Sequence, residues 1–340
     1  ADMGEEIAQA LGVKISHFKR LMRATDEEEA KEQPSPSQYV TSAGGVVGQV
    51  VFEQCVTWDE AGSVTCAYAV RQADGKIAMQ ATVDVGDTTF VPFPGTIDLI
   101  RKRVVLFPAG VSEFGSQRAL LGEIRAFIHR WLDIDTFYEH LASYYIMFTW
   151  LYDLFETLPY LRALGDYGTG KSRFLQTIGV LCYRPMFVSG ASTASPIFRV
   201  IDMFRGTLVI DEADFANSDA EAEIIKIVNV GYARGGVVLR SEKDQSSDSY
   251  YPSAKDVFCP KILATRRLFQ DRATESRCLT KRMSTAKPRA EIPRLLSRAF
   301  WAEAEGLRNR LLLYRLRCYR PMDIDPALSD FSIEPRLDQV

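Results

Sequence analysis

The sequence predicts an α/β fold, in which a parallel-sheet core follows a helical linker and a small N-terminal antiparallel β domain. Strand-like and helix-like patterns alternate from residue 158 onward, and such alternation implies crossover connections between parallel strands. Short β-branched runs separated by glycines occupy residues 39–110, which is typical of an antiparallel sheet. With 340 residues, 46% of them hydrophobic, the chain is long enough for two or three domains.

The net charge of −3 hides an asymmetry along the chain. Residues 255–320 contain 17 Lys and Arg but only 6 Asp and Glu. A basic block of this kind is typical of a surface that contacts a polyanion such as nucleic acid. The alternative is a solvated helix face whose arginines form local ion pairs.

Cysteine content and hydropathy exclude several other classes of protein. The six cysteines form no C-x-x-C pair and only three histidines accompany them, so neither a zinc module nor a disulfide framework is expected. A reducing, cytoplasmic location fits best. The most apolar stretch, Leu141 to Phe155, is too short to span a bilayer and is expected to be a buried helix, with no membrane partner. Because the chain begins at Ala1, we expect a processed form or a piece of a longer protein.

The first part of the chain has helical spacing and then the composition of a linker. Glu6 to Val13 is similar to the opening of a helix-turn-helix, although a packing or linker role is favoured over DNA recognition. In the β domain that follows, Ala73-Asp74-Gly75 predicts a hairpin. The sequence leaves open whether this domain is a collar, a docking surface or an oligonucleotide-binding barrel. Its predicted strands are Val46–Val56, Ser63–Gln72, Lys76–Val85, Thr88–Val91 and Arg103–Phe107.

Two helices are predicted next, Gln117–Leu132 and Asp135–Phe155. The second carries aromatic residues on most faces, which indicates burial between domains more than a surface for base stacking. Beyond them, the core is expected to contain a helix at Asp219–Val230, a hairpin entered at Gly235-Gly236 and an Arg-rich helix at Arg294–Cys318. The predicted core strands are Tyr160–Leu164, Met186–Ser189, Leu208–Asp211 and Ile262–Thr265.

The predicted organisation therefore has six parts. They are a helical segment and linker (1–38), the β domain (39–110), a helical linker or collar (111–157), the parallel-sheet core (158–290), an Arg-rich helical lid (291–320) and an acidic tail (321–340).

Residues 165–172 spell G-x-x-x-x-G-K-S, the pattern of a P-loop. Its glycines let the backbone turn so that N–H groups face phosphate oxygens, Lys171 reaches the β- and γ-phosphates, and the Ser172 hydroxyl is offered to Mg²⁺. An apolar stretch before the loop and a helical pattern after it match the strand and helix that this loop needs. The predicted nucleotide-binding residues are Gly165, Asp166, Tyr167, Gly168, Thr169, Gly170, Lys171, Ser172 and Arg173.

A second apolar run, Thr207 to Ile210, ends in Asp211-Glu212. A buried strand of this kind would deliver Asp211 to the metal and Glu212 to the water that attacks the γ-phosphate. Together the two motifs predict a site for ATP and Mg²⁺. The letters D-E-A-D at 211–214 match the RNA helicases of that name only superficially, because those enzymes have a second motor domain and a longer interval between the two motifs.

Five features occur in a fixed order: the P-loop, the Asp-Glu strand, a Gly-Gly hairpin with basic residues, the strand at 260–265 and the segment Asp271 to Arg277. This series resembles the AAA+ class of P-loop ATPases and, within it, the superfamily 3 helicases of viruses, phages and plasmids. The resemblance covers residues 158–283 and leaves the first 110 residues unexplained.

The resemblance implies roles for residues outside the two nucleotide motifs. Thr265 stands at the sensor position, usually an asparagine, where its hydroxyl could make the same hydrogen bond to the γ-phosphate or the attacking water. Arg277 matches the arginine finger that a neighbouring subunit's site would receive, with Arg272 as the competing candidate. A finger implies a ring, with six subunits the expected number. Arg240 and Lys243 match a hairpin that grips DNA phosphates in the ring's channel, although a solvated surface hairpin is the alternative.

The resemblance therefore implies a Mg²⁺-dependent ATPase motor of a ring-shaped DNA helicase that translocates on single-stranded or forked DNA in the replication of a mobile element. A primase or origin-binding module would be a further partner. Two alternatives stay open: an AAA+ ATPase that remodels protein partners, and a nucleotide-binding scaffold that only recruits DNA.

Overall fold

The computed structural model describes residues 38–189, 192–211, 218–243 and 250–321. The predicted helical segment at 1–37, with its helix-turn-helix pattern, and the tail from residue 322 lie outside the described residues. The described chain divides into a smaller unit, residues 38–40 and 84–91, and a larger unit, residues 41–83 and 92–321.

The smaller unit is built on a three-stranded sheet in the order β1-β7-β6. The amide of Gln38 donates to the carbonyl of Asp87 at 2.8 Å, and the Thr89 hydroxyl donates to Asp84 at 2.6 Å. Its strands are β1 (Gln38–Thr41), β6 (Val83–Val85) and β7 (Thr88–Val91), of which the terminal residues Thr41 and Val83 fall in the larger unit.

The larger unit begins with a four-stranded antiparallel sheet in the order β2-β3-β4-β5. The hairpin predicted at Ala73-Asp74-Gly75 is confirmed, since β4 and β5 pair across it. Two predicted strands were wrong. Val46–Val56 is interrupted by a turn at Gly48, where φ is +59°, and Lys76–Val85 breaks into β5 and β6, which belong to different sheets. The strands are β2 (Gly44–Val47), β3 (Val50–Trp58), β4 (Val64–Arg71) and β5 (Ile77–Gln80).

The core of the larger unit is a five-stranded parallel sheet in the order β14-β8-β13-β10-β9. The four predicted core strands are confirmed. The edge strand β14 was not predicted, because its sequence, Cys-Leu-Thr-Lys-Arg, lacks the apolar run of a buried parallel strand. The strands are β8 (Tyr160–Leu164), β9 (Met186–Ser189), β10 (Leu208–Asp211), β13 (Lys261–Thr265) and β14 (Cys278–Arg282).

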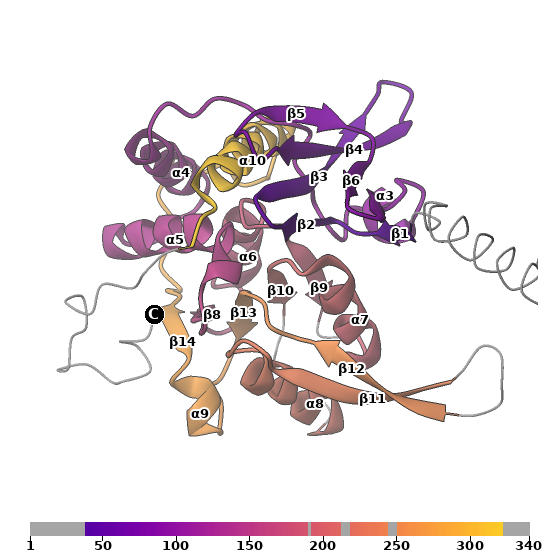
Figure 1. The fold of residues 1–340 in the computed structure, drawn as a ribbon. Coiled ribbons are helices and arrows are strands. Elements are labelled where there is room, and N and C mark those ends of the chain that lie inside the picture. Colours follow the sequence, from indigo (N-terminus) through magenta and orange to yellow (C-terminus); the bar gives the residue numbers. More distant parts are fainter. Residues whose placement is uncertain (1–37, 190–191, 212–217, 244–249, 322–340) are drawn as a thin grey trace, which may run out of the picture. The chain divides into compact units, whose positions relative to one another are not determined.

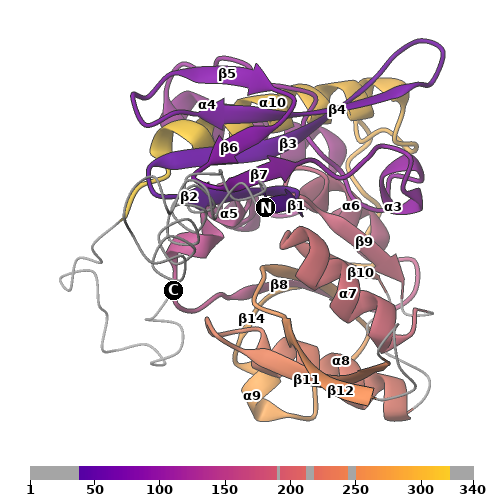
Figure 2. The same ribbon diagram turned by 45° about the vertical axis from the view of Figure 1, so that its right-hand side comes forward.

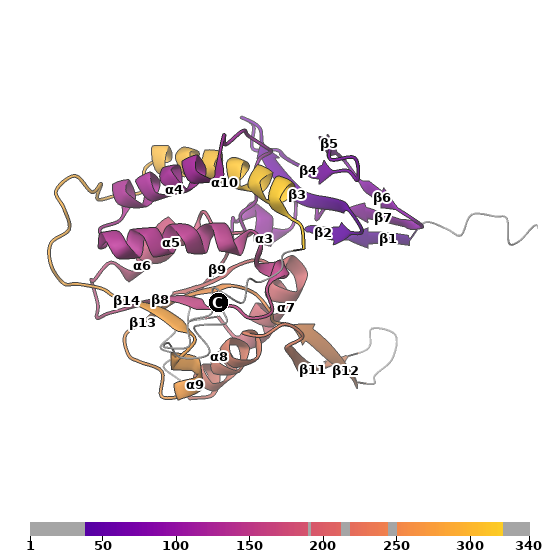
Figure 3. The same cartoon turned by 60° about the vertical axis from the view of Figure 1, so that its left-hand side comes forward.

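Helices cover both faces of this sheet (Figure 3). One face carries α6 (Lys171–Gly179) with α5 (Thr136–Thr149), and α4 (Gln117–Trp131) and α10 (Arg298–Cys318) lie beyond them. The other face carries α7 (Ala194–Phe204) and α8 (Ser218–Val230). The side chains of Ser116 and Asp135 accept hydrogen bonds from the first turns of α4 and α5, which explains where both helices begin. Short helical turns are α3 (Asp98–Arg101), η1 (Tyr152–Leu154) and α9 (Arg272–Glu275).

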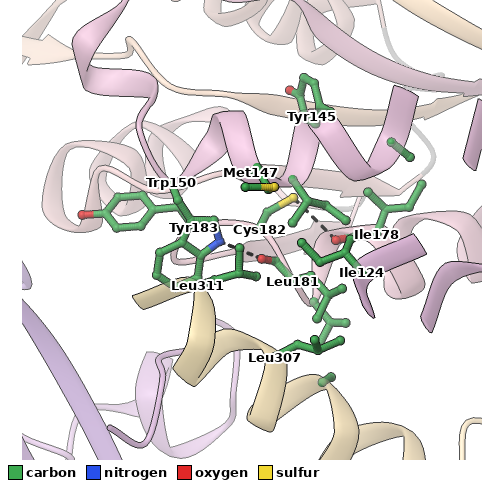
Figure 4. Packing of buried hydrophobic residues seen from close by; sticks show 14 of the residues in the cluster. Ile124, Tyr145, Met147, Trp150, Ile178, Leu181, Cys182, Tyr183, Leu307 and Leu311 are labelled. Atoms are coloured by element: carbon green, nitrogen blue, oxygen red, sulfur yellow. Dashed lines mark hydrogen bonds between the residues drawn. The ribbon is translucent and has the colours of Figure 1, made fainter. Parts of the chain in front are cut away.

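Alternate residues of the sheet supply two hydrophobic cores, as the period of a strand requires. Val209 and Ile262 pack with the α4, α5, α6 and α10 layer, whereas Leu208 and Leu263 pack with α7 and α8. Figure 4 shows the first core, where residues of α5, α6 and α10 interdigitate. There the Trp150 indole N–H donates to the Leu181 carbonyl at 2.9 Å.

The predicted burial of the aromatic helix holds for only part of α5. Tyr138 and Tyr145 are buried, but Phe137 and Tyr144 are exposed. Within the part of the chain that the structure describes, no helix is both long enough and apolar enough to cross a bilayer.

The strand predicted at Arg103–Phe107 was wrong. Arg103 takes a left-handed conformation with φ of 55° directly after α3, which ends any extended run. The chain then runs beside β9 of the parallel sheet: Val105 bridges Met186, and the Phe187 amide donates to the Val104 carbonyl at 2.9 Å. This segment therefore extends the edge of the core sheet, and it also contacts the β2–β5 sheet at its end, where the Pro108 carbonyl accepts from the Val56 amide at 2.9 Å.

A buried charge network joins the β2–β5 sheet to the core and to α10. The carboxylate of Glu53 in β3 accepts from Arg184 at 2.5 Å and from Arg315 of α10 at 2.6 Å, and the Tyr183 hydroxyl donates to it at 2.9 Å. Arg315 also forms two bonds to Asp153, at 2.7 and 2.8 Å. Burial opposes the charge of Asp153, but the Arg315 guanidinium outweighs it and lowers the pKa of that carboxyl. The two carboxylates and two guanidiniums balance in charge.

Several cations of the basic block at 255–320 form ion pairs with acids elsewhere in the chain. Besides Arg315, four more pairs join the block to the segment at 113–135: Lys281–Asp135, Arg289–Asp133, Arg310–Glu123 and Arg317–Glu113. The charge asymmetry along the sequence is therefore partly neutralised in three dimensions, which leaves less of the block for a polyanion than its composition indicates.

Candidate nucleotide site

The P-loop lies between β8 and α6, as the motif predicts. Gly170 precedes the helix with φ of +87°, in the left-handed region that L side chains rarely adopt. A Cβ atom on Gly165 would lie 2.8 Å from the Thr169 hydroxyl, so this position needs glycine to let the loop close on itself. The first N–H groups of an α-helix have no partner within the helix, so those of α6 can bind an anion at its N-terminus.

Lys171 begins α6 and its ammonium lies over the loop. It donates to the carbonyl oxygens of Gly165 at 2.6 Å and Asp166 at 2.7 Å, and the Thr169 hydroxyl donates to the same Asp166 carbonyl at 2.8 Å. The loop is thus closed around the cation that phosphate oxygens would contact.

Asp211 ends β10 and shares a cavity of about 350 Å³ with the P-loop. Because the carboxyl ends of parallel strands meet at one edge of the sheet, residues after β8 and β10 converge there. Glu212, the predicted water-activating residue, lies outside the described residues. The cavity is lined by Tyr167, Gly168, Thr169, Gly170, Lys171, Ser172, Arg173, Asp211 and Arg266.

The strand that ends in Thr265 lies between β8 and β10 in the sheet. The Gly165 amide donates to the Thr265 carbonyl at 3.1 Å, which ties the end of β13 to the start of the P-loop. The Thr265 side chain is fully buried, and its hydroxyl has no hydrogen-bond partner among the described residues. An unpaired buried hydroxyl is costly. Thr265 lies between the two nucleotide motifs, but it is not among the residues that line the cavity shared by Asp211 and the P-loop.

A larger cavity of about 560 Å³ also adjoins the P-loop and shares Gly168, Thr169, Gly170 and Arg173 with the first. Its lining combines apolar residues with six charged ones, Asp133, Asp135, Arg173, Lys281, Lys287 and Arg294, and apolar walls of this kind can hold a flat heterocyclic ring. Sequence reasoning missed this wall, because it comes from the segments after α4 and after β14, which carry no motif. Its apolar lining is Leu132, Ile134, Met283, Ala286, Pro288, Ile292 and Pro293.

Arg173 stands between the two cavities. It donates to the carbonyls of Pro293 at 3.1 Å and Arg294 at 2.5 Å, and burial lowers the pKa of its guanidinium. These hydrogen bonds hold the segment at 293–294 against the first turn of α6. The same segment lines the larger cavity.

These residues fit a nucleoside triphosphate with Mg²⁺. The loop supplies N–H donors and the Lys171 cation, while the Ser172 hydroxyl and the Asp211 carboxylate are oxygen ligands of the kind that Mg²⁺ takes. The adjoining apolar cavity has room for the base.

The two candidate arginine fingers differ in their surroundings. The Arg277 guanidinium donates to the Asn229 amide oxygen and lies 4.8 Å from the centre of the Tyr232 ring, so it is held within its own chain. Arg272, at the start of α9, is exposed. Beside it, hydrogen bonds from the Thr274 hydroxyl and the Asn229 amide lower the pKa of Asp271 to about 2, so this cap is charged at neutral pH.

The predicted hairpin is confirmed as β11 (Val237–Lys243) and β12 (Tyr250–Asp256), and it extends from the body of the larger unit (Figures 1 and 2). Arg240 does not project from the hairpin: its guanidinium stacks at 4.2 Å on the ring of Phe198 in α7. The opposite face of the hairpin is apolar and open, with Leu239 70% and Tyr250 67% exposed. Lys243 ends β11, and its side chain lies outside the described residues.

Arg266 lines the cavity of about 350 Å³ that Asp211 shares with the P-loop, and the sequence did not predict it as a site residue. Its guanidinium donates to the Tyr167 hydroxyl and lies 4.5 Å from the centre of that ring. Its position directly after the predicted sensor was the only available signal.

No family model matches the sequence, and a search of curated proteins finds no match. Similar solved structures include the JCV helicase (13% identity, TM-score 0.34, 61% of this chain and 55% of that one) and the SCCmec type IV Cch helicase (10%, 0.36, 91% and 51%). The C-terminal region of NrS-1 is similar at 10% identity and a TM-score of 0.34, over 76% of this chain and 65% of that one. The chain thus spans about half to two thirds of the lengths of these proteins. Since TM-scores below 0.5 do not establish a shared fold, the interpretation rests on the residues of this chain.

Proposed function

We propose that this chain is the Mg²⁺-dependent ATPase motor of a ring-shaped DNA helicase of the AAA+ class, similar to the superfamily 3 helicases. The observation that carries the proposal is the convergence of Lys171, Ser172 and Asp211 on one cavity at the carboxyl edge of a parallel sheet. The strand order supports it, because β13, which ends in Thr265, lies between the strand that precedes the P-loop and the strand that ends in Asp211.

In this proposal, Lys171 and the loop amides bind the phosphates, and Ser172 and Asp211 would hold Mg²⁺. Bound there, the metal supplies Lewis acidity to the phosphate oxygens. Glu212 orients the attacking water, and Thr265 hydrogen-bonds to the γ-phosphate or to that water. Arg240 and Lys243 contact DNA phosphates, with the Phe198 ring holding the Arg240 guanidinium.

The proposal is tested by steady-state ATP hydrolysis with Mg²⁺, measured with and without single-stranded DNA. Stimulation by the strand is expected, since a translocating motor couples hydrolysis to its track. If DNA does not change the hydrolysis rate of an assembled oligomer, the assignment as a DNA motor is wrong. If that oligomer does not hydrolyse ATP at all, the assignment as an ATPase is wrong. Unwinding assays then measure strand separation of forked DNA. The same assays test whether an added primase or origin-binding module changes that activity.

Thr265→Val is expected to lower turnover about ten- to hundredfold while leaving the fold intact. Valine has nearly the same shape as threonine, and removing a hydroxyl that is buried without a partner relieves a desolvation cost of about 1–3 kcal/mol. The measurements are kcat and the midpoint of thermal unfolding. A variant that loses stability and keeps its turnover would show that the hydroxyl has a structural role.

Arg277→Ala is expected to spare nucleotide affinity in the monomer and to stop hydrolysis in the assembled ring, because a finger acts on a neighbour's site. Arg272→Ala is the matched comparison, since both changes remove a guanidinium from the segment at 271–277. Each variant is assayed for nucleotide binding and for hydrolysis above and below the concentration at which the wild type assembles. If only Arg272→Ala stops hydrolysis, the finger is Arg272; if neither does, the ring mechanism is wrong.

The open face of the β11–β12 hairpin favours a second candidate, an AAA+ ATPase that remodels protein partners. Val237, Leu239 and Tyr250 present apolar side chains there, which suit a polypeptide at least as well as DNA phosphates. Stimulation of hydrolysis by an unfolded polypeptide, and not by DNA, would favour this candidate.

A further inference from the structure

Arg266 emerges at a defined point of the candidate site. It follows Thr265 at the end of β13, and β13 lies between the strand that precedes the P-loop and the strand that ends in Asp211. Its side chain therefore enters the cavity between the phosphate-binding loop and the proposed metal ligand.

The different linings of the two adjoining cavities indicate in which orientation a nucleotide would bind. Gly168, Thr169, Gly170 and Arg173 line both, whereas Lys171, Asp211 and Arg266 line only the smaller one. A nucleotide whose base occupies the larger, apolar cavity would run its phosphates past the loop glycines into the smaller one. Its last phosphate would then lie in the smaller cavity, which Arg266 lines together with Lys171 and Asp211.

Tyr167 holds the Arg266 side chain within this cavity. It belongs to the P-loop, and its side chain is 74% exposed, so it adds little to the hydrophobic core. Its contacts with Arg266 are a hydrogen bond from the guanidinium to the phenol oxygen and the stacking described above. Such contacts restrict a long side chain that would otherwise sample many rotamers.

We propose that Arg266 contacts the terminal phosphate of a nucleoside triphosphate bound to its own chain, and that Tyr167 is the residue that positions it. The inference rests on the proposed nucleotide site. A guanidinium presents a planar fork of N–H donors that matches two phosphate oxygens, and it stays charged at any physiological pH. In this proposal a diphosphate has no terminal phosphate for Arg266 to contact, so Arg266 would let the site distinguish triphosphate from diphosphate without help from a neighbouring subunit.

The test is calorimetric titration of the full chain, in the presence of Mg²⁺, with ADP and with adenylyl imidodiphosphate, a triphosphate analogue that resists hydrolysis. Arg266→Ala is expected to weaken binding of the triphosphate analogue about ten- to hundredfold and to leave ADP binding unchanged. Arg267→Ala is the matched control: this neighbouring arginine is exposed and lies outside the cavity, so its variant should bind both nucleotides as the wild type does.

Tyr167→Ala is expected to reduce the preference for the triphosphate by less than Arg266→Ala does. Adding it to Arg266→Ala should cause no further loss, because a positioning residue acts only through its partner. If Arg266→Ala does not fold, as judged by thermal unfolding, Arg266→Lys replaces it and should lose part of the preference, since an ammonium lacks the fork.

The outcomes separate this proposal from the one on which it rests. Equal losses for both nucleotides, or no loss for either, in a wild type that binds both would overturn the role of Arg266 and leave the nucleotide site standing. Failure of the wild type to bind either nucleotide would overturn the site itself, and this inference with it.

Discussion

Lys171→Ala is expected to abolish detectable ATP hydrolysis, with a loss of at least about a hundredfold. The Lys171 ammonium is placed by two carbonyls of the loop, whereas the other cation in the first turn of α6, Arg173, donates to the carbonyls of Pro293 and Arg294. Charge on the β- and γ-phosphates would lose its nearest compensating group. Nucleotide affinity should fall about ten- to hundredfold, as expected for one charge-assisted contact. Phosphate release and calorimetry measure the two effects.

The control for this change is Lys76→Ala. Lys76 lies in the β4–β5 turn with its side chain 84% exposed, so the variant removes the same group far from the cavity and should hydrolyse ATP at the wild-type rate. Thermal unfolding must accompany the assay, because Lys171 also bonds to its own loop. A folded Lys171→Ala protein with normal turnover would refute the P-loop assignment.

Glu53→Gln is expected to lower the free energy of unfolding by about 3–5 kcal/mol, the usual cost of removing one partner from a buried ion pair. Glutamine keeps the shape of the side chain, but only one of its terminal atoms can accept hydrogen bonds. Arg184 and Arg315 would then share a single neutral acceptor, with Asp153 as the remaining carboxylate of the network. Since domains are stable by about 5–15 kcal/mol, the loss should be plain in urea-induced unfolding.

The matched control is Glu113→Gln, which removes the same charge from the exposed pair with Arg317 and should leave the unfolding midpoint unchanged. A further test separates charge from packing. Because much of the loss comes from the uncompensated Arg184 guanidinium, Glu53→Gln combined with Arg184→Met should be less destabilised than the two changes added together. Additive losses would show that the network acts through packing alone.

Sequence reasoning was most successful where a local pattern decides the structure. The four strands of the core at 160–164, 186–189, 208–211 and 261–265 form apolar runs bounded by turn residues. It was least successful where the partner of a segment lies far along the chain. The residues at 103–107 have strand-like composition, yet their pairing is decided by β9, about eighty positions away. Strand β14 is polar enough to sit at an edge, and its hydrogen bonds to β8 alone make it a strand.

The same difference applies to the candidate site. The P-loop and Asp211 were predicted because their chemistry depends on residue types at fixed spacing. The wall of the larger cavity and the position of Arg266 were not predicted, because they depend on which segments the fold brings beside the loop. The basic block at 255–320 was predicted to face a polyanion, but several of its cations instead pair with acids more than a hundred residues away in the same chain.

By itself, the sequence determined the elements with short-range signals: the glycine loop that turns into α6, the buried strands around it, and the hairpin at residues 237–256. The tertiary structure alone decided the order of the strands, and with it the placement of Thr265 and Arg266 between the P-loop and Asp211. It also decided the pairing of Glu53 with Arg315, which are 262 residues apart. The physical reason is that backbone conformation responds to neighbouring residues, whereas the pairing of buried charges and strand edges is settled only when the whole core excludes water.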